Sequence, residues 1–187
     1  MARSAEKTRA TNETDIVLRL DLDGTGSTDV STGVPFFDHM LDALGRHGSF
    51  DLVVKATGDL EVDAHHTVED VGIVFGQAIA EALGDKTGVR RFGSAAVPMD
   101  EACVLAAIDI SGRGGLVYEV DLPIEFIGSF DTTLAKEFLI ALATNAGLTL
   151  HVHMLSGENS HHIVEAVFKA VARALREAVE IDPRVEG

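Results

Sequence analysis

The chain has 187 residues, of which 46% are hydrophobic and 24% are charged, a composition typical of a globular protein. This length is sufficient for one domain with a substantial core, or for two fused half-domains. The formal net charge of −15 at pH 7 argues against nucleic acid or an anionic membrane as a partner. A small anionic ligand is not excluded, provided that basic side chains gather locally.

The single cysteine and the polar first segment together predict a cytoplasmic protein. Cys103 has no second cysteine with which to form an internal disulfide, which is typical of a reducing compartment. Residues 1–15 lack the apolar stretch of a secretory signal peptide. No segment approaches the roughly 18 consecutive apolar residues of a transmembrane helix. We therefore expect no association with a membrane.

The first half of the chain alternates between strand and helix patterns. In chain order, the predicted elements are a strand at 16–23, a turn at 23–26, a strand at 27–33, a helix at 35–48, a strand at 51–57 and a helix at 65–84. Strict alternation of apolar and polar residues indicates the first strand, and the glycine-rich turn after it resembles that of a hairpin. Pro35 suits the first turn of the first helix.

The second half repeats this order. Its predicted elements are strands at 94–98, 102–110 and 115–121, a turn at 111–115, a helix at 131–146, a strand at 148–155 and a helix that begins at 161. We interpret both halves as β-β-α-β-α units, which indicates duplication of one unit. The prediction is an α+β fold with half-domains at 1–90 and 91–187 that together form one compact domain.

A short pattern, His-His-x-x-Glu, stands at the start of a predicted helix in each half. Its two copies are His65, His66 and Glu69, and His161, His162 and Glu165. The offset between them is constant (161 − 65 = 96 and 165 − 69 = 96). Residues four apart on a helix share a face, so each motif places one imidazole beside the carboxylate and aims the other to the neighbouring side. The pattern predicts a metal site.

Two further residues extend these motifs into matched ligand sets. His39 lies 26 residues before His65, and Glu137 lies 24 before His161, so they occupy corresponding positions. The two predicted sets are His39, His65, His66 and Glu69, and Glu137, His161, His162 and Glu165. Imidazole with carboxylate suits Mn, Fe, Zn, Co or Ni rather than Ca or Mg. A purely structural metal remains an alternative.

Basic residues near these motifs suggest an anionic substrate. Lys169 follows Glu165 by one helical turn, so it either holds a substrate's anionic tail or is a solvated helix lysine. Arg113 lies in the glycine-rich turn 111–115, where its guanidinium and backbone donors could bind phosphate, although turns favour glycine in any case. His47 shares a helix face with His39.

Four segments resemble the imidazoleglycerol-phosphate dehydratases of histidine biosynthesis. They are 37–41 (FDHML), 63–70 (DAHHTVED), 109–114 (DISGRG) and 159–169 (NSHHIVEAVFK). The resemblance implies metal-dependent dehydration of D-erythro-imidazole glycerol phosphate to imidazole acetol phosphate by a hydro-lyase. It also implies four helices packed between two sheets, the ribosomal protein S5 domain 2-like fold. The implied assembly is a 24-subunit shell of trimers with metal sites at subunit interfaces.

The same resemblance assigns roles to residues of this chain. The implied ligands of two Mn²⁺ ions per active site, with other divalent transition metals as alternatives, are His39, His65, His66, Glu69, Glu137, His161, His162 and Glu165. The implied substrate contacts are Glu13, His39, His47, Arg91, Arg113 and Lys169. For proton transfer we expect Glu13, His47 and Glu165 to be the catalytic residues.

The chain departs from the family pattern at two places, and two other functions remain as alternatives. Some relatives have histidine where this chain has Glu137, which implies a more anionic metal shell. The family usually continues past Asp182-Pro183-Arg184 with a Ser-Thr-Lys tail over the substrate phosphate, so we expect either that the sequence is truncated or that phosphate capture is weaker, with metal binding and assembly intact. The alternatives are a non-catalytic oligomeric metal-binding protein and a dinuclear hydrolase, whose metals would lie about 3.5–4 Å apart.

Overall fold

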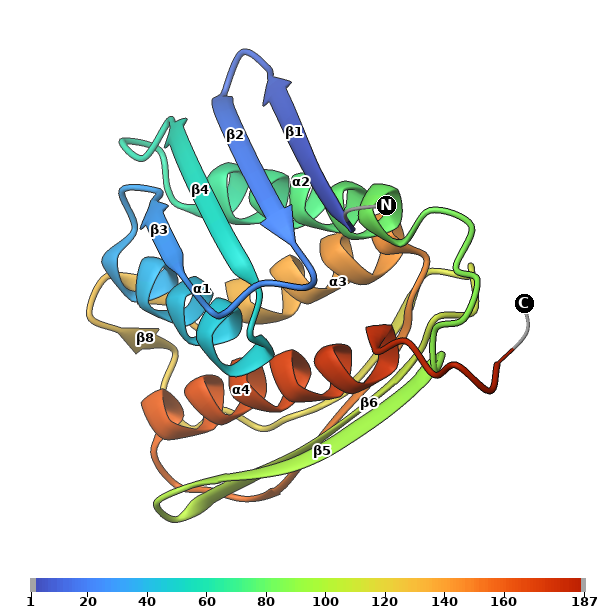
Figure 1. Ribbon diagram of the computed structural model, residues 1–187. Coiled ribbons are helices and arrows are strands. Elements are labelled where there is room, and N and C mark those ends of the chain that lie inside the picture. Colours follow the sequence, from blue (N-terminus) through green and yellow to red (C-terminus); the bar gives the residue numbers. More distant parts are fainter. Residues whose placement is uncertain (1–2, 186–187) are drawn as a thin grey trace.

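Four helices form the middle of the molecule, with a four-stranded sheet over each side (Figure 1). The computed structural model describes residues 3–185. This arrangement confirms the predicted α+β class and the placement of four helices between two sheets. Within residues 3–185, no helix is both long and apolar enough to cross a membrane.

The first sheet and its two helices come from the first half of the chain. The elements are β1 (Ser4–Ala10), β2 (Thr14–Asp21), β3 (Thr28–Ser31), α1 (Pro35–Gly48), β4 (Asp51–Gly58) and α2 (His65–Leu83). The strand order is β1-β2-β4-β3, antiparallel except that β3 runs parallel to β4. Alternate residues of β2, namely Ile16, Leu18 and Leu20, are buried, as a strand with one face on the core requires.

The second half builds a sheet with the same order and directions. Its elements are β5 (Phe92–Met99), β6 (Ala102–Asp109), β7 (Gly115–Glu119), β8 (Phe126–Ile127), β9 (Phe130–Asp131), α3 (Leu134–Ala146), β10 (Thr149–Ser156) and α4 (Ser160–Val179). The order is β5-β6-β10-β7, with β7 parallel to β10. The matching topologies are consistent with duplication, while the division between residues 90 and 91 stays a prediction.

The structure corrects three details of the predicted elements. The first half begins with three strands rather than two, and β1 is missing from the prediction because its sequence, SAEKTRA, buries only one side chain, Ala5. The turn at 23–26 does not form a hairpin, since β4 lies between β2 and β3. The third helix begins at Leu134 rather than at 131, because residues 130 and 131 pair with β8.

A cluster of phenylalanines joins all four helices in one core. Phe37, Phe75, Phe138 and Phe168 come one from each helix, and all are fully buried. The ring of Phe138 has its centroid 5.3 Å from that of Phe37, 6.3 Å from Phe75 and 5.4 Å from Phe168. The side chain of Phe138 therefore connects the helices of one half with those of the other.

Helices α2 and α3 approach each other closely at two glycines of α2. A Cβ atom on Gly76 would lie 2.6 Å from the carbonyl oxygen of Leu142, 2.8 Å from Cβ of Asn145 and 2.9 Å from the nitrogen of Ala146. A Cβ on Gly72 would lie 2.7 Å from the carbonyl oxygen of Phe138. Because these neighbours are mostly backbone atoms, a side chain at either position forces the helices apart.

We expect Gly76→Ala to destabilise the protein despite alanine's better helix propensity. Alanine gains about 1 kcal/mol in a helix interior, whereas overpacking against backbone typically costs about 1–3 kcal/mol. Because the added Cβ would meet three atoms at less than 3 Å, we expect a cost in the upper part of this range. The net loss is then about 1–2 kcal/mol, seen as a melting temperature lower by several degrees at a fixed protein concentration. Gly115→Ala is the control, because nothing lies within 4 Å of its Cβ position. An unchanged melting temperature for Gly76→Ala would contradict the close packing.

Candidate metal centre

The four helices all begin at the same end of the molecule. Residues at the starts of α1, α2 and α3 line one cavity of about 430 Å³, among them Pro35, His65 and Leu134. The start of α4 joins them, because the ring of His161 packs edge-on against that of Phe36, with centroids 5.1 Å apart. Helix N-termini carry partial positive charge and favour carboxylates nearby. Both His-His-x-x-Glu motifs therefore lie at this end.

Three side chains from α1 and α4 form a compact ligand cluster. Ligand atoms of His39, His161 and Glu165 all lie within 4.8 Å of one another. The Glu165 Oε2 atom is 3.4 Å from Nε2 of His39 and 3.3 Å from Nε2 of His161. Metal bonds to these atoms measure about 2.0–2.2 Å, so ligands at these separations fit around one ion. Two imidazoles and a carboxylate suit a divalent transition metal.

The carboxylate of this cluster is buried and ionised. Glu165 is only 7% exposed. Burial alone would raise its pKa, but the hydrogen bond and charge of Lys169, together with those of His39, lower it below the ordinary value. The Lys169 Nζ atom donates to Glu165 Oε1 at 2.6 Å, and its own side chain is 16% exposed. Lys169 therefore lies against the cluster rather than in solvent.

The first motif is more open than the second. The His65 Nε2 atom is 3.8 Å from Oε2 of Glu69, and both side chains are nearly half exposed. Ile73 occupies the position that corresponds to Lys169. Glu137, in the first turn of α3, makes no ion pair within the described residues. In residues 3–185, His39, His161 and Glu165 form the one group of three ligands this close together, so a single chain does not assemble the predicted sets.

The second imidazole of each motif is held by a carboxylate from a turn. His66 Nδ1 is 2.9 Å from Asp59 Oδ2, and His162 Nδ1 is 2.7 Å from Glu101 Oε2. These hydrogen bonds raise the pKa of both histidines, and those from His162 and the Asn159 N–H lower the pKa of Glu101 to about 2. With Nδ1 engaged, each ring presents Nε2 to a possible metal. Neither carboxylate belongs to the repeated motif, so the pattern does not reveal this role.

Two candidates for proton transfer flank the ligand cluster and the first motif. His47 lies two turns after His39 on α1, and its pKa is lowered by burial first and then by the charges of Lys169 and Arg173. A neutral imidazole can accept a proton. Glu13 is exposed in the turn between β1 and β2, where its carbonyl oxygen accepts a hydrogen bond from the N–H of Asp59. Glu13 is therefore near His66.

Arg91 and Arg113 lie at the opposite end of α4. The N–H of Arg91 donates to the carbonyl oxygen of Ala178, and its guanidinium pairs with Asp109 at 2.7 Å. The carbonyl oxygen of Arg113 accepts a hydrogen bond from Thr149, which stands opposite Asp109 in the sheet. Ala178 follows His161 by 17 residues, or about 26 Å of helix. No small ligand can contact these arginines and His161 of the same chain.

Comparison with known proteins identifies the family of this chain. A family model described as imidazoleglycerol-phosphate dehydratase matches residues 32–175, a range that contains all four segments that carry the resemblance and both motifs. The chain belongs to this family. Its relatives include imidazoleglycerol-phosphate dehydratases of Acidiphilium cryptum, 62% identical over 100% of this chain and 95% of that protein, and of Acetivibrio thermocellus, 58% identical over 100% and 96%.

Solved structures of imidazoleglycerol-phosphate dehydratases share the fold. The Staphylococcus aureus structure has a TM-score of 0.87 and 37% identity, and the match covers 96% of this chain and 99% of that one. The Pyrococcus furiosus structure, in complex with (S)-C348, has a TM-score of 0.84 and 40% identity, with 97% of each chain covered. Membership in the imidazoleglycerol-phosphate dehydratase family favours a hydro-lyase over a storage protein or a dinuclear hydrolase.

Proposed function

We propose that this protein removes water from D-erythro-imidazole glycerol phosphate to give imidazole acetol phosphate in histidine biosynthesis. The observation that carries the proposal is the cluster of His39, His161 and Glu165, with Lys169 beside it, in a chain of the dehydratase family. The cluster supplies ligands for a divalent metal, and the lysine supplies a cation for a phosphorylated substrate. A metal-storage protein needs only the first of these.

The residues around the cluster suit the proton transfers of a dehydration. A proton must leave a carbon atom, and the departing hydroxyl must receive one. His47 has a pKa below its ordinary value and can accept a proton near neutral pH, while Glu13 is a second candidate near His66. Glu165, held ionised, orients the imidazoles of His39 and His161. A bound divalent metal would supply Lewis acidity at the substrate's imidazole ring.

We propose that neighbouring copies of the chain complete the active site. The separation of about 26 Å between His161 and the Arg91 region requires another copy if these arginines bind the same substrate. The exposed ligands of the first motif, His65 and Glu69, also leave coordination positions open toward a neighbour. In keeping with the family resemblance, we propose two Mn²⁺ per active site and trimers that assemble into 24 subunits. We also propose a cytoplasmic location. The contribution of Glu137 and of a Ser-Thr-Lys tail stays a prediction.

The direct test is an assay of the manganese-loaded protein with imidazole glycerol phosphate. We expect formation of imidazole acetol phosphate, and loss of the activity when the metal is removed by a chelator and its recovery when Mn²⁺ is restored. Metal content is measured in parallel on the same sample. A protein that holds its metal and shows no product, both as it stands and with a Ser-Thr-Lys tail restored, would contradict the dehydratase function and favour the storage protein.

A further inference from the structure

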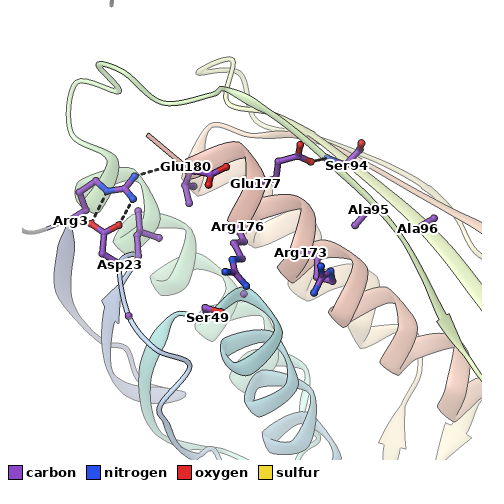
Figure 2. A pocket seen from close by; sticks show the side chains of 14 residues that line it. Arg3, Asp23, Ser49, Ser94, Ala95, Ala96, Arg173, Arg176, Glu177 and Glu180 are labelled. Atoms are coloured by element: carbon purple, nitrogen blue, oxygen red, sulfur yellow. Dashed lines mark hydrogen bonds and ion pairs between the residues drawn. The ribbon is translucent and has the colours of Figure 1, made fainter. Parts of the chain in front are cut away.

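A cavity of about 660 Å³ lies beside the last two turns of α4 (Figure 2). The metal-cluster residues His161 and Glu165 lie in the first turns of the same helix. The walls of the cavity come from the loop after β2, the end of α1, the middle of β5 and the last two turns of α4. None of the metal-cluster residues lines it. Its volume is in the range of about 300–1,000 Å³ that is typical of small-molecule sites.

Two arginines of α4 point into this cavity without an acidic partner. In Figure 2, the guanidinium of Arg176 lies between α4 and Ser49 at the end of α1, and Arg173 lies one turn away on α4. Both side chains are exposed, and within residues 3–185 neither makes an ion pair or a side-chain hydrogen bond. Arg173 follows His161 by 12 residues, or about 18 Å of helix.

The acidic residues of the same cavity are all engaged by other groups. Asp23 pairs with Arg3. Glu177 and Glu180 both accept from Arg90, each at 2.9 Å, and Glu177 also accepts from the N–H of Ser94 at 2.9 Å. Two guanidinium groups of the lining are therefore left without a direct acidic contact, and the lining together with Arg90 has four arginines against three carboxylates, in a chain with 30 acidic and 15 basic residues.

A role in capping α1 does not account for Arg176. Helix C-termini attract cations, but the carbonyl oxygen of Arg46 accepts from the N–H of Ser49 and that of Gly45 from the N–H of Phe50. No hydrogen bond joins Arg176 to a carbonyl oxygen of α1 within the described residues. One guanidinium group can bind two phosphate oxygens at once through two parallel N–H donors, and these hydrogen bonds are stronger than those from a neutral donor.

We propose that this cavity is a second anion site, which binds the phosphate group of a small molecule through Arg173 and Arg176. The site shares no lining residue with the metal cluster, the charge of Arg173 acts also on His47, and the proposed phosphate binding does not depend on the proposed dehydratase function. Ser49, whose hydroxyl lies beside Arg176 in Figure 2, offers a further donor. The shared chemistry is a phosphate dianion, either free or as a monoester.

Calorimetric titration of the metal-loaded protein with inorganic phosphate tests this site. The Lys169→Gln variant serves as the background, because it removes the cation beside the metal cluster. We expect this variant to keep one phosphate site per chain. Adding Arg173→Gln and Arg176→Gln to it is expected to weaken that binding by about tenfold for each lost charge-assisted contact. The matched control adds Arg19→Gln and Arg184→Gln, two exposed arginines that pair with Glu6 and Asp182.

Three outcomes decide the proposal. Binding that survives Lys169→Gln and is lost with Arg173 and Arg176, but not with the control pair, supports it. No phosphate binding in the Lys169→Gln background overturns it, and so does binding in that background that persists when Arg173 and Arg176 are replaced; either result leaves these arginines with a purely electrostatic role near the end of α1. Repeating the titration with glycerol phosphate distinguishes a monoester, expected to bind more tightly than phosphate, from free phosphate, expected to bind equally or better.

Discussion

Glu165→Gln is expected to lower metal affinity by at least about 100-fold, more than the 10–100-fold typical of losing a residue that only supports a ligand. The carboxylate is the member of the cluster that contacts both imidazoles, at 3.4 Å from His39 and 3.3 Å from His161. Glutamine keeps the shape but removes the charge, and it leaves the ammonium of Lys169 without its partner in a nearly buried site. Dehydratase activity at limiting metal is expected to fall in proportion.

Equilibrium dialysis against Mn²⁺, followed by the activity assay at limiting and saturating metal, measures this effect. Glu81→Gln is the matched control, because Glu81 is also a helical glutamate paired with a lysine, Lys7, but is exposed on α2. We expect the control to bind metal as the unchanged protein does. Equal metal affinity in Glu165→Gln would show that the cluster is not the metal centre.

Phe138→Ala is expected to have the largest effect on stability. The side chain is fully buried and its ring contacts those of Phe37, Phe75 and Phe168, so alanine leaves a cavity where all four helices meet. Truncation of a buried phenylalanine typically costs about 3–5 kcal/mol. Because one core joins both halves, we expect the two halves to lose stability together in a single transition.

Urea unfolding at a fixed protein concentration measures this loss. Phe92→Ala is the matched control, since Phe92 is 58% exposed and its main partner is the guanidinium of Arg91, 4.9 Å from the ring centroid. We expect the control to lose at most about 1 kcal/mol, the size of an exposed cation–π contact. Two separate transitions in Phe138→Ala would argue that the halves fold independently.

Local sequence patterns predicted the helices well and the strand pairing poorly. Helices α1, α2 and α4 begin within one residue of their predicted starts, because proline and the apolar period of 3.6 residues act within a helix. β1 carries no such signal, since it is an edge strand with polar residues on both faces. The parallel pairing of β3 with β4 depends on contacts between segments more than 20 residues apart, which a turn motif does not encode.

The candidate site shows the same division between local and long-range information. Helix periodicity places His161 and Glu165 on one face, and the internal repeat points to His39, which lies 126 residues before Glu165. The repeat does not reveal that the equivalent residues of the first half stay apart in one chain. Nor does it show the carboxylates of Asp59 and Glu101, because their hydrogen bonds to the histidines arise from the paths of separate turns.

The two motifs are alike in sequence but differ in their neighbours, so a site formed by both motifs would have two unlike sides. Lys169 lies against Glu165 in one copy, whereas apolar Ile73 occupies the same position in the other. An imidazole ring has a nitrogen on each side, so two identical ligand sets would accept it in either orientation. A ligand with a charged tail has only one of these orientations beside the lysine. In the shared active site proposed above, this asymmetry would select which nitrogen of the ring faces which motif.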